Sequence, residues 1–555
     1  MLKSTLLAAA LVSAGSAALA QQPVGAGGQL QQIPPVPMPE RATPDFQVKR
    51  DEAAPEAAPA GPKIRVQALH VTGQTLFSEA ELLSATSFVP ISELNLSDLR
   101  ALAKEITAFY NRRGYFLAQA YVPEQELQGG TVTIALVEGR FGKIALNNQA
   151  NVADRVAHGI LAGMESGNVV ATAPLERRLL LLSDVPGVLV RSTLSPGTAV
   201  GTSDLLVDLA PGRRITGSIE GDNAGNRYTG AWRAGGTVNL NNPTGNGDML
   251  SLRVLTSFSG LAYGRASYQA PVGQATVGVA YAHIDYDLGR EFKSLDASGN
   301  AEIASIYASY PLIRSHDSNL YLLAGADAKW FEDKLGFISA VNHRKTQVLT
   351  AGLAGDLRDS VGGAGWNVYS LGLTVGNLDI QDPVARAADA ATARSDGSYG
   401  KLQYSVARLQ TVTGPLSLYG SVRGQIAFNN LDISEKMELG GAYAVRAYPE
   451  GEAYGDQGYV ATAELRLQLA ELTHGLPGGV GLFGFVDVGA VDYAKNPWFP
   501  GSNKAKRSAY GGGVSWAAPG NFVLTATYAR KLGNAEATSA PDRSGRAWFQ
   551  VSKLF

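Results

Sequence analysis

Apolar and polar residues alternate one by one through much of the C-terminal part of the chain. In residues 461–469 the odd positions are Ala or Leu, whereas the even positions are polar, Thr462 and Glu464 among them. Residues 416–428 follow the same rule. Such alternation predicts β-strands with one apolar and one polar face. Roughly 16 such pieces, each about 10 to 14 residues long, lie between residues 215 and 555, separated by Gly, Asn, Asp and Ser.

The length of these strands indicates a membrane, because strands of this size cross a bilayer when they are tilted. A soluble β-sandwich would show the same alternation, but no helical layer is available to cover so large a sheet. The chain also ends in an alternating strand closed by an aromatic residue, with Phe549, Val551 and Phe555 on one face. That ending is typical of bacterial outer-membrane barrels and makes Phe555 a candidate barrel-assembly signal. We therefore expect residues 215–555 to form a 16-stranded antiparallel transmembrane β-barrel.

Residues 64–214 have a different, mixed α/β pattern. Leu99, Leu102 and Ile106 recur at helical spacing, and Asn95 is the candidate N-cap of that helix. A second unit repeats the theme in looser form. We expect strands at residues 116–122, 131–137, 188–194 and 204–209, and a second helix at residues 174–182. The pattern fits two small domains, residues 64–139 and 140–214.

The N-terminal residues have the features of an export signal. Lys3 precedes an apolar stretch, and Ala18-Leu19-Ala20 offers an A-x-A cleavage site, so we predict a signal peptide at residues 1–20. Residues 21–63 are rich in Pro, Ala, Gln and Gly. That composition buries too little apolar surface to offset the cost of ordering, so we expect an extended, mobile linker with at most a short helix around residues 29–33.

The composition excludes several functions. Lys and Arg (47) nearly balance Asp and Glu (49), so no basic surface for nucleic acid is expected. The absence of Cys removes disulfides and thiolate metal sites, and the six His lack ligand spacing. A G-x-G-x-x-G match at residues 479–484 opens a strand with no helix behind it, so it does not indicate a nucleotide site. With no nucleophile beside a base, we expect neither an enzyme nor a cofactor or metal.

One loop of the barrel region, residues 429–457, is unusually long and follows the eleventh expected strand. Its candidate motif residues are Gly440, Gly441, Val445, Arg446, Tyr448, Gly455 and Asp456, followed by Gly458. Two strands later, Phe483, Phe485, Asp487 and Gly489 share one face by parity. Because a carboxylate on the lipid face is costly, Asp487 should point into the lumen, where it invites a cation.

These motifs resemble those of the two-partner secretion transporters, the TpsB-type ShlB/FhaC/HecB group within the outer-membrane barrel-assembly superfamily. Val445-Arg446-Ala447-Tyr448 matches the V-R-G-[YF] motif of that group except at Ala447, and residues 485–489 match its F-x-D-x-G motif. Residues 179–187 and 222–225 look like its second POTRA helix and its first barrel strand. The resemblance covers residues 64–555.

The resemblance implies two periplasmic POTRA domains, residues 64–139 and 140–214, before the outer-membrane barrel. It also implies that the long loop folds into the lumen, where Arg446 pairs with Asp487 in a latch. A planar guanidinium matches a carboxylate well. The alternative is that Arg446 is solvated and that Asp487 pairs with Arg466 or Lys329.

The function implied by the resemblance is a pore that recognises a partner exoprotein through the POTRA domains and translocates it unfolded to the cell surface. The expected partner is a large secreted β-helical protein of adhesin or cytolysin type. Outer-membrane lipids and, during biogenesis, the barrel-assembly machinery are further expected partners. Two alternatives are a barrel-assembly insertase, which usually carries more POTRA domains, and a passive solute porin, which needs neither periplasmic domains nor an inward arginine.

Overall fold

The computed structural model describes residues 25–34, 44–49, 61–126, 129–469 and 477–555. The predicted signal peptide, residues 1–20, lies outside them. The chain forms two compact units. One contains the mixed α/β residues and the other contains the barrel, and each is described by itself below.

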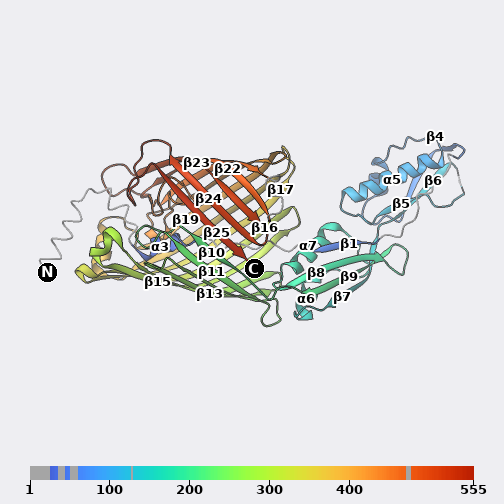
Figure 1. Ribbon diagram of the computed structural model, residues 1–555. Helices are drawn as coiled ribbons and strands as arrows, with labels where there is room; N and C mark the ends of the chain where they lie inside the picture. Colours follow the sequence, from blue (N-terminus) through green and yellow to red (C-terminus); the bar gives the residue numbers. More distant parts are fainter. Residues whose placement is uncertain (1–24, 35–43, 50–60, 127–128, 470–476) are drawn as a thin grey trace. The chain divides into compact units, whose positions relative to one another are not determined.

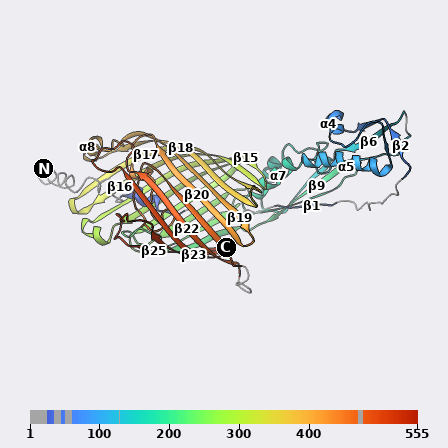
Figure 2. The same cartoon turned by 90° about the horizontal axis from the view of Figure 1, so that it is seen from above.

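Sixteen antiparallel strands, β10 to β25, form a closed barrel in simple sequence order, which confirms the predicted barrel (Figures 1 and 2). The strands are β10 Ile215–Asp222, β11 Arg233–Asn241, β12 Met249–Thr256, β13 Leu261–Val272, β14 Ala275–Asp287, β15 Ala297–Arg314, β16 Ser318–Leu335, β17 Ala340–Asp359, β18 Gly365–Ile380, β19 Gly397–Thr413, β20 Leu416–Ala427, β21 Gln457–Gln468, β22 Gly479–Asp492, β23 Lys504–Ala518, β24 Phe522–Lys531 and β25 Gly545–Leu554. Short helices lie between strands: η1 Arg290–Leu295, η2 Gly336–Ile338, α8 Pro383–Ala391 and η3 Ile433–Glu435.

The alternation predicted from the sequence sets which side chains face inward. On β21, Leu465 is 53% exposed whereas Glu464 is 7% exposed. On β22, Val486 and Val488 are exposed on either side of the fully buried Asp487. The apolar residues thus form the outer surface, and the polar ones line the interior.

The barrel closes between its first and last strands. β10 and β25 pair from Ser218↔Leu554 to Asp222↔Gln550, and Phe555 exchanges backbone hydrogen bonds of 3.0 and 3.1 Å with Gly217. Phe555 therefore belongs to the closing seam. Its role as an assembly signal stays a prediction.

The other unit contains two α/β arrangements. The first has the sheet β3-β6-β5, the pair β2-β4 and two helices over one core. Its elements are β2 Ile64–Val66, β3 Ala68–Thr72, α4 Glu79–Ser84, β4 Ser92–Leu94, α5 Leu96–Arg112, β5 Gln119–Tyr121 and β6 Thr131–Val137. The Asn95 side chain caps α5 as expected, because it accepts from Asp98 N–H while Asp98 accepts from Asn95 N–H.

The second arrangement has the sheet β1-β8-β9-β7 and its own core. Its elements are β7 Arg140–Asn148, α6 Asp154–Leu161, α7 Thr172–Ser183, β8 Val188–Pro196 and β9 Thr202–Pro211, together with β1 Asp45–Val48. The expected strands at residues 188–194 and 204–209 and the helix at residues 174–182 all fall within these elements.

The composition of residues 21–63 predicts an extended, mobile linker with at most a short helix around residues 29–33, but their described part contains two docked elements. Helix α3, Ala26–Gln31, packs on η3 and on β14 to β16 inside the barrel unit, and β1 joins the second α/β sheet. Ala26 belongs to an apolar cluster of the barrel interior, and Leu30 and Ile33 pack against it. Polar groups of the interior meet the neighbouring amides: Thr229 donates to Gln29 Oε1 at 3.1 Å, and Gln32 Nε2 donates to the Tyr454 hydroxyl at 2.7 Å.

Candidate functional site

Residues 428–456, between β20 and β21, pack against the inner wall of the barrel; we call them the lumen loop. At its base, Met437 and Gly455 exchange backbone hydrogen bonds of 2.8 and 2.9 Å. Its apolar side chains join those of the wall in one buried cluster, in which Val445 and Tyr448 are fully buried. The lumen loop is therefore a packed part of the barrel interior.

Arg446 makes the central contact between the lumen loop and the wall. Its Nε and Nη2 donate to the two carboxylate oxygens of Asp487 at 2.8 and 2.7 Å, and its backbone N–H donates to Asp487 Oδ2 at 3.2 Å. Asp487 also accepts a hydrogen bond from the Thr462 hydroxyl at 2.9 Å. Two parallel bonds between a planar guanidinium and a carboxylate fix both the position and the orientation of Arg446.

Two more wall residues contact this guanidinium. Glu464 Oε1 accepts from Arg446 Nη1 at 2.8 Å, and the Phe485 ring centre lies 3.4 Å from the guanidinium carbon. We call Arg446, Glu464, Phe485 and Asp487 the Arg446 site. The sequence parity of β21 already placed Glu464 inward, but nothing in the sequence showed that it would share the arginine.

The alternative partners of Asp487 are bound elsewhere. Arg466 Nη2 donates to Glu464 Oε2 at 2.6 Å, and Lys329 Nζ donates to Glu435 Oε1 at 2.7 Å. The structure thus brings together the residues that the loop and wall motifs singled out.

Ala447 stands where the related motif has glycine. Its methyl group is buried in the cluster of the lumen loop, and its φ is not positive. The backbone at this position does not require glycine, so the departure is compatible with the same loop path.

Glycines allow close approach both within the lumen loop and between the lumen loop and the wall. A Cβ at Gly489 would lie 2.6 Å from the Leu439 side chain, and Gly441 has a φ of +104° beside Glu450. The other predicted glycines also lie where a Cβ would meet neighbouring atoms: Gly440, Gly455 and Gly458. The motif is rich in glycine because a larger side chain at these positions would clash with neighbouring atoms.

A second buried ion pair of the lumen loop was not expected from the sequence. Arg507 on β23 donates to Glu452 Oε1 at 2.9 and 2.5 Å, while Glu452 Oε2 accepts from the backbone N–H groups of Thr538 and Ser539 at 2.8 and 3.0 Å. Because Glu452 and Arg507 lie far apart in the chain, no local sequence pattern predicts their contact. It ties the lumen loop to the connection between β24 and β25.

The remaining predicted residues are close to these contacts. Asp456 Oδ1 accepts from Lys436 Nζ at 2.6 Å at the base of the loop. The Tyr448 hydroxyl donates to the Ala535 carbonyl oxygen at 3.0 Å. Phe483 packs against the buried cluster from the wall. Phe555 lies at the seam and is not among the residues of this cluster.

Helix α3 is a second occupant of the barrel interior. The Ala26 N–H donates to Asp333 Oδ1 at 2.8 Å, and Arg233 Nη1 donates to the Gln32 carbonyl oxygen at 2.7 Å. Gln31 Nε2 donates to the Ile433 carbonyl oxygen of η3 at 2.7 Å. Helix α3 therefore contacts both the wall and the lumen loop.

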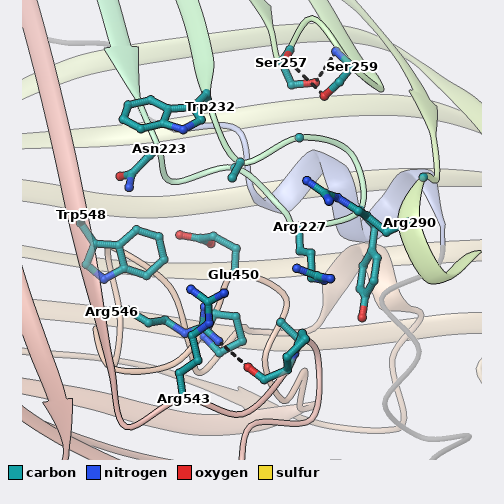
Figure 3. Close-up of a pocket in the computed structure, with 18 of the residues that line it drawn as sticks. Asn223, Arg227, Trp232, Ser257, Ser259, Arg290, Glu450, Arg543, Arg546 and Trp548 are labelled. Atoms are coloured by element: carbon teal, nitrogen blue, oxygen red, sulfur yellow. Dashed lines mark hydrogen bonds between the residues drawn. The ribbon is translucent and has the colours of Figure 1, made fainter.

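A cavity of about 580 Å³ lies between the connection from β10 to β11 and the residues at the start of β25 (Figure 3). Its lining includes four arginines and one acid: Arg227, Arg290, Arg543, Arg546 and Glu450. Trp548, also in the lining, donates from its indole N–H to the Arg446 carbonyl oxygen at 2.7 Å. Trp548 thus connects this arginine-rich cavity to the Arg446 backbone.

Among the described residues, no helix is both long and apolar enough to span a membrane. Within those same ranges, no group of three or more His, Cys, Asp or Glu is placed to hold a metal ion. The polar groups of the site are instead used in pairing the lumen loop with the wall.

Comparison with known proteins identifies relatives over most of the chain. The heme/hemopexin transporter protein HuxB of Haemophilus influenzae is 29% identical over 453 residues, covering 80% of this chain and 79% of HuxB. The outer membrane transporter CdiB of Dickeya dadantii is 24% identical over 423 residues, covering 74% of each chain. The solved structure of CdiB from Escherichia coli, 22% identical, shares the fold with a TM-score of 0.71 over 91% of this chain and 93% of that one.

Two family descriptions match directly. "POTRA domain, ShlB-type" matches residues 64–139, and "Haemolysin secretion/activation protein ShlB/FhaC/HecB" matches residues 201–499. The second match alone covers more than half of the chain. The chain therefore belongs to the ShlB/FhaC/HecB family of two-partner secretion transporters, non-enzymatic outer-membrane β-barrels with periplasmic POTRA domains that export partner exoproteins.

Proposed function

We propose that the Arg446 site is the latch that holds the lumen loop inside the closed barrel, and that export requires the loop and α3 to leave their present positions. The observation that carries this proposal is the paired contact of Arg446 with Asp487 on the inner wall. Both occupants combine apolar packing with polar contacts, and water and a passing polypeptide can replace the polar contacts. The occupied lumen has to clear before a chain passes through it.

The size of the interaction suits a latch. A hydrogen bond to a charged group contributes about 1.5–3 kcal/mol. Removing one partner of a buried pair costs about 3–5 kcal/mol, because the other charge is left unpaired. The pair thus favours one loop position without making it irreversible.

Residues 64–139 and 140–214 act in this proposal as two POTRA domains that capture the unfolded partner. Sheet edges bind extended segments by adding a strand, which gives affinity through backbone hydrogen bonds. No nucleotide is available outside the inner membrane to supply energy for export. Folding of the partner at the cell surface therefore supplies the direction.

The partner in this proposal is a large secreted β-helical protein of adhesin or cytolysin type. Names of relatives support a protein cargo of this general kind: one is a hemolysin transporter and another a heme/hemopexin transporter. The exposed apolar side chains of the barrel, Leu465 and Val486 for example, contact outer-membrane lipids. Phe555 is the proposed signal to the barrel-assembly machinery.

The test compares the secreted and surface proteins of cells with and without this chain by mass spectrometry. We expect the loss of one large β-helical protein, with its unexported form in the periplasm, while other outer-membrane barrels keep their levels. A general loss of barrels would instead indicate an insertase. Steady, solute-selective conductance of the purified chain without any partner would indicate a porin.

A further inference from the structure

The arginine-rich cavity of Figure 3 lies at the cell-surface end of the barrel. β10 follows the periplasmic α/β domains in the chain, so its first residue lies at the periplasmic end and its last, Asp222, at the opposite end. Because antiparallel strands in sequence order alternate in direction, the connections after β10, β12, β14 and β24 all lie at that opposite end. Each of these connections contributes residues to the cavity.

The cavity lies beyond the point where the closing seam of the barrel stops. β10 pairs with β25 only as far as Gln550. Asn223 then ends the seam, because its side chain donates to the Ala547 carbonyl oxygen at 3.0 Å and accepts from the Phe549 N–H at 2.7 Å. Trp232, which lines the cavity beside this point, is 63% exposed. Exposed Trp is typical of the level of the lipid headgroups, so the cavity lies at that level in the outer leaflet.

The arginines of the cavity are only partly neutralised by acids of the protein. Arg227 Nη2 lies 2.6 Å from Glu291 Oε1, which pairs that charge. The side chains of Arg290 and Arg543, by contrast, make no hydrogen bond or ion pair with any described residue. Glu450 is the one acid in the lining. The cavity therefore carries a net positive charge, which favours an anion.

Arg546 also has unused capacity to donate hydrogen bonds. Its Nη2 donates to the Pro541 carbonyl oxygen at 3.3 Å, and its buried Nε has no hydrogen-bond partner in the part of the chain that the structure describes. A buried donor without an acceptor is costly. An anion that supplies acceptor oxygens here would remove that cost, and Figure 3 shows the four arginines reaching into the same cavity.

The remaining lining indicates which kind of anion fits. A planar guanidinium binds two oxygens of one phosphate group at once. Trp232 and Trp548 line the same cavity, and an indole face packs well against the apolar face of a sugar ring. The volume of about 580 Å³ lies within the usual range for small-ligand pockets. The combination of arginine and Trp therefore favours a phosphorylated sugar.

We propose that this cavity binds a phosphorylated sugar, with the arginines on its phosphate and an indole face against its ring. The residues assigned to the phosphate are Arg290, Arg543 and Arg546. The outer leaflet of a bacterial outer membrane is built of glycolipids with phosphorylated sugar headgroups, so a ligand of this chemistry is present at the level of the cavity.

The lumen loop forms part of this site. Pro449 and Glu450 line the cavity, so the site is complete only while the loop stays inside the barrel. A ligand that binds one position of the loop stabilises that position, and the bound sugar therefore favours the resting transporter. This second step rests on the proposed function, whereas the binding site does not. An acidic segment of the exported chain fits less well, because it passes after the loop has left.

Native mass spectrometry of the full-length transporter in a non-ionic detergent tests the site. The probe is diphosphoryl lipid A, and the same lipid without its phosphates is the control. We expect the dephosphorylated lipid to bind at least about ten-fold more weakly. Equal binding of the two lipids would overturn the proposal. Free glucosamine 1-phosphate that binds as tightly as the lipid would support the site but identify a soluble source.

Substitutions locate the binding. Arg543→Gln with Arg546→Gln should weaken binding of the diphosphoryl lipid at least about ten-fold. Arg290→Gln, which alters no barrel strand, should weaken it in the same direction. Arg530→Gln is the matched control, because Arg530 is exposed at the same end of β24 but does not line the cavity. Equal weakening in the control would mean general attraction to anionic lipid and would overturn the site. Displacement of the lipid by an acidic peptide, but not by glucosamine 1-phosphate, would assign the cavity to a polypeptide instead.

Thiol labelling tests the effect on the lumen loop. The chain has no Cys, and Thr462 lies under the Arg446 site, so Thr462→Cys reports departure of the loop. Diphosphoryl lipid A should slow this labelling about three-fold or more, and Arg543→Gln with Arg546→Gln should abolish the effect. Unchanged labelling despite binding would overturn the stabilisation of the loop. Labelling that Arg446→Ala fails to accelerate would refute the latch alone, because the binding experiment does not depend on it.

Discussion

At the scale of single residues, substitutions of Arg446 test the proposed latch directly. Arg446→Ala should leave insertion and heat-resistant barrel folding intact but reduce export at least about ten-fold, because it leaves Asp487 buried without its cation. Asp487→Asn should act similarly, and the double variant should be little worse than either single one. Arg446→Lys should restore only part of export, since an ammonium lacks the planar fork. The measurement is the surface yield of the partner per folded barrel.

Arg466→Ala is the matched control for this series. Arg466 also pairs with Glu464 but does not contact Asp487, so its loss should change export little. Strictly additive losses of Arg446 and Asp487 would mean that the two residues act separately, and the latch would have to be abandoned.

We expect Glu138 to make the stability of the first α/β domain, residues 64–139, depend on pH in the acidic range. Burial raises the pKa of this carboxyl, but hydrogen bonds from Thr75, Leu76 and Tyr110 more than offset burial and lower it below its ordinary value. Ionised Glu138 therefore stabilises the fold above the ordinary Glu pKa of about 4.3, and this contribution is lost as the pH falls through the lowered folded-state value.

Glu138→Gln should accordingly flatten the loss of stability on acidification and lower stability at neutral pH. Amide exchange protection factors for residues 64–139 in the full-length chain measure both effects. Glu93→Gln, at an exposed position of β4, is the control and should follow the wild-type profile. An unchanged acid profile in Glu138→Gln would refute the assignment.

At the scale of elements, strand parity predicts how β21 reacts with thiol reagents. Leu465→Cys should react with a lipid-soluble reagent, because Leu465 faces outward. Thr462→Cys should react only with a water-soluble reagent, and slowly, because Thr462 lies under the Arg446 site. Labelling rates in intact cells measure this, and adding Arg446→Ala should raise the rate at position 462 alone. Identical labelling at both positions would refute the strand register.

At the scale of the whole molecule, the proposed function assigns capture and translocation to different units of the chain. Deleting residues 64–139 removes one complete α/β core but none of the barrel strands. The barrel should still insert, whereas binding of the partner in a pull-down should be lost. Partner binding by this deleted chain at the wild-type level would show that residues 64–139 are dispensable for capture.

The sequence by itself singled out Arg446 through the resemblance of its loop motif to a known family. It also determined the strand parity of the barrel, the α/β character of residues 64–214 and the inward position of Asp487. These follow from local rules: alternation on a strand, spacing on a helix, and the cost of a charge facing lipid. Because strand parity assigns each side chain to one face of the sheet, it also predicts that Asp487 and Glu464 face the barrel interior.

Only the tertiary structure decided which inward residues meet. The sharing of Arg446 with Glu464, the pair Glu452–Arg507 and the docking of α3 join segments distant in the chain, and no periodic pattern encodes them. The same holds for β1, whose composition predicts an extended linker. β1 becomes a strand because the β8 edge supplies backbone partners that four residues cannot supply for themselves.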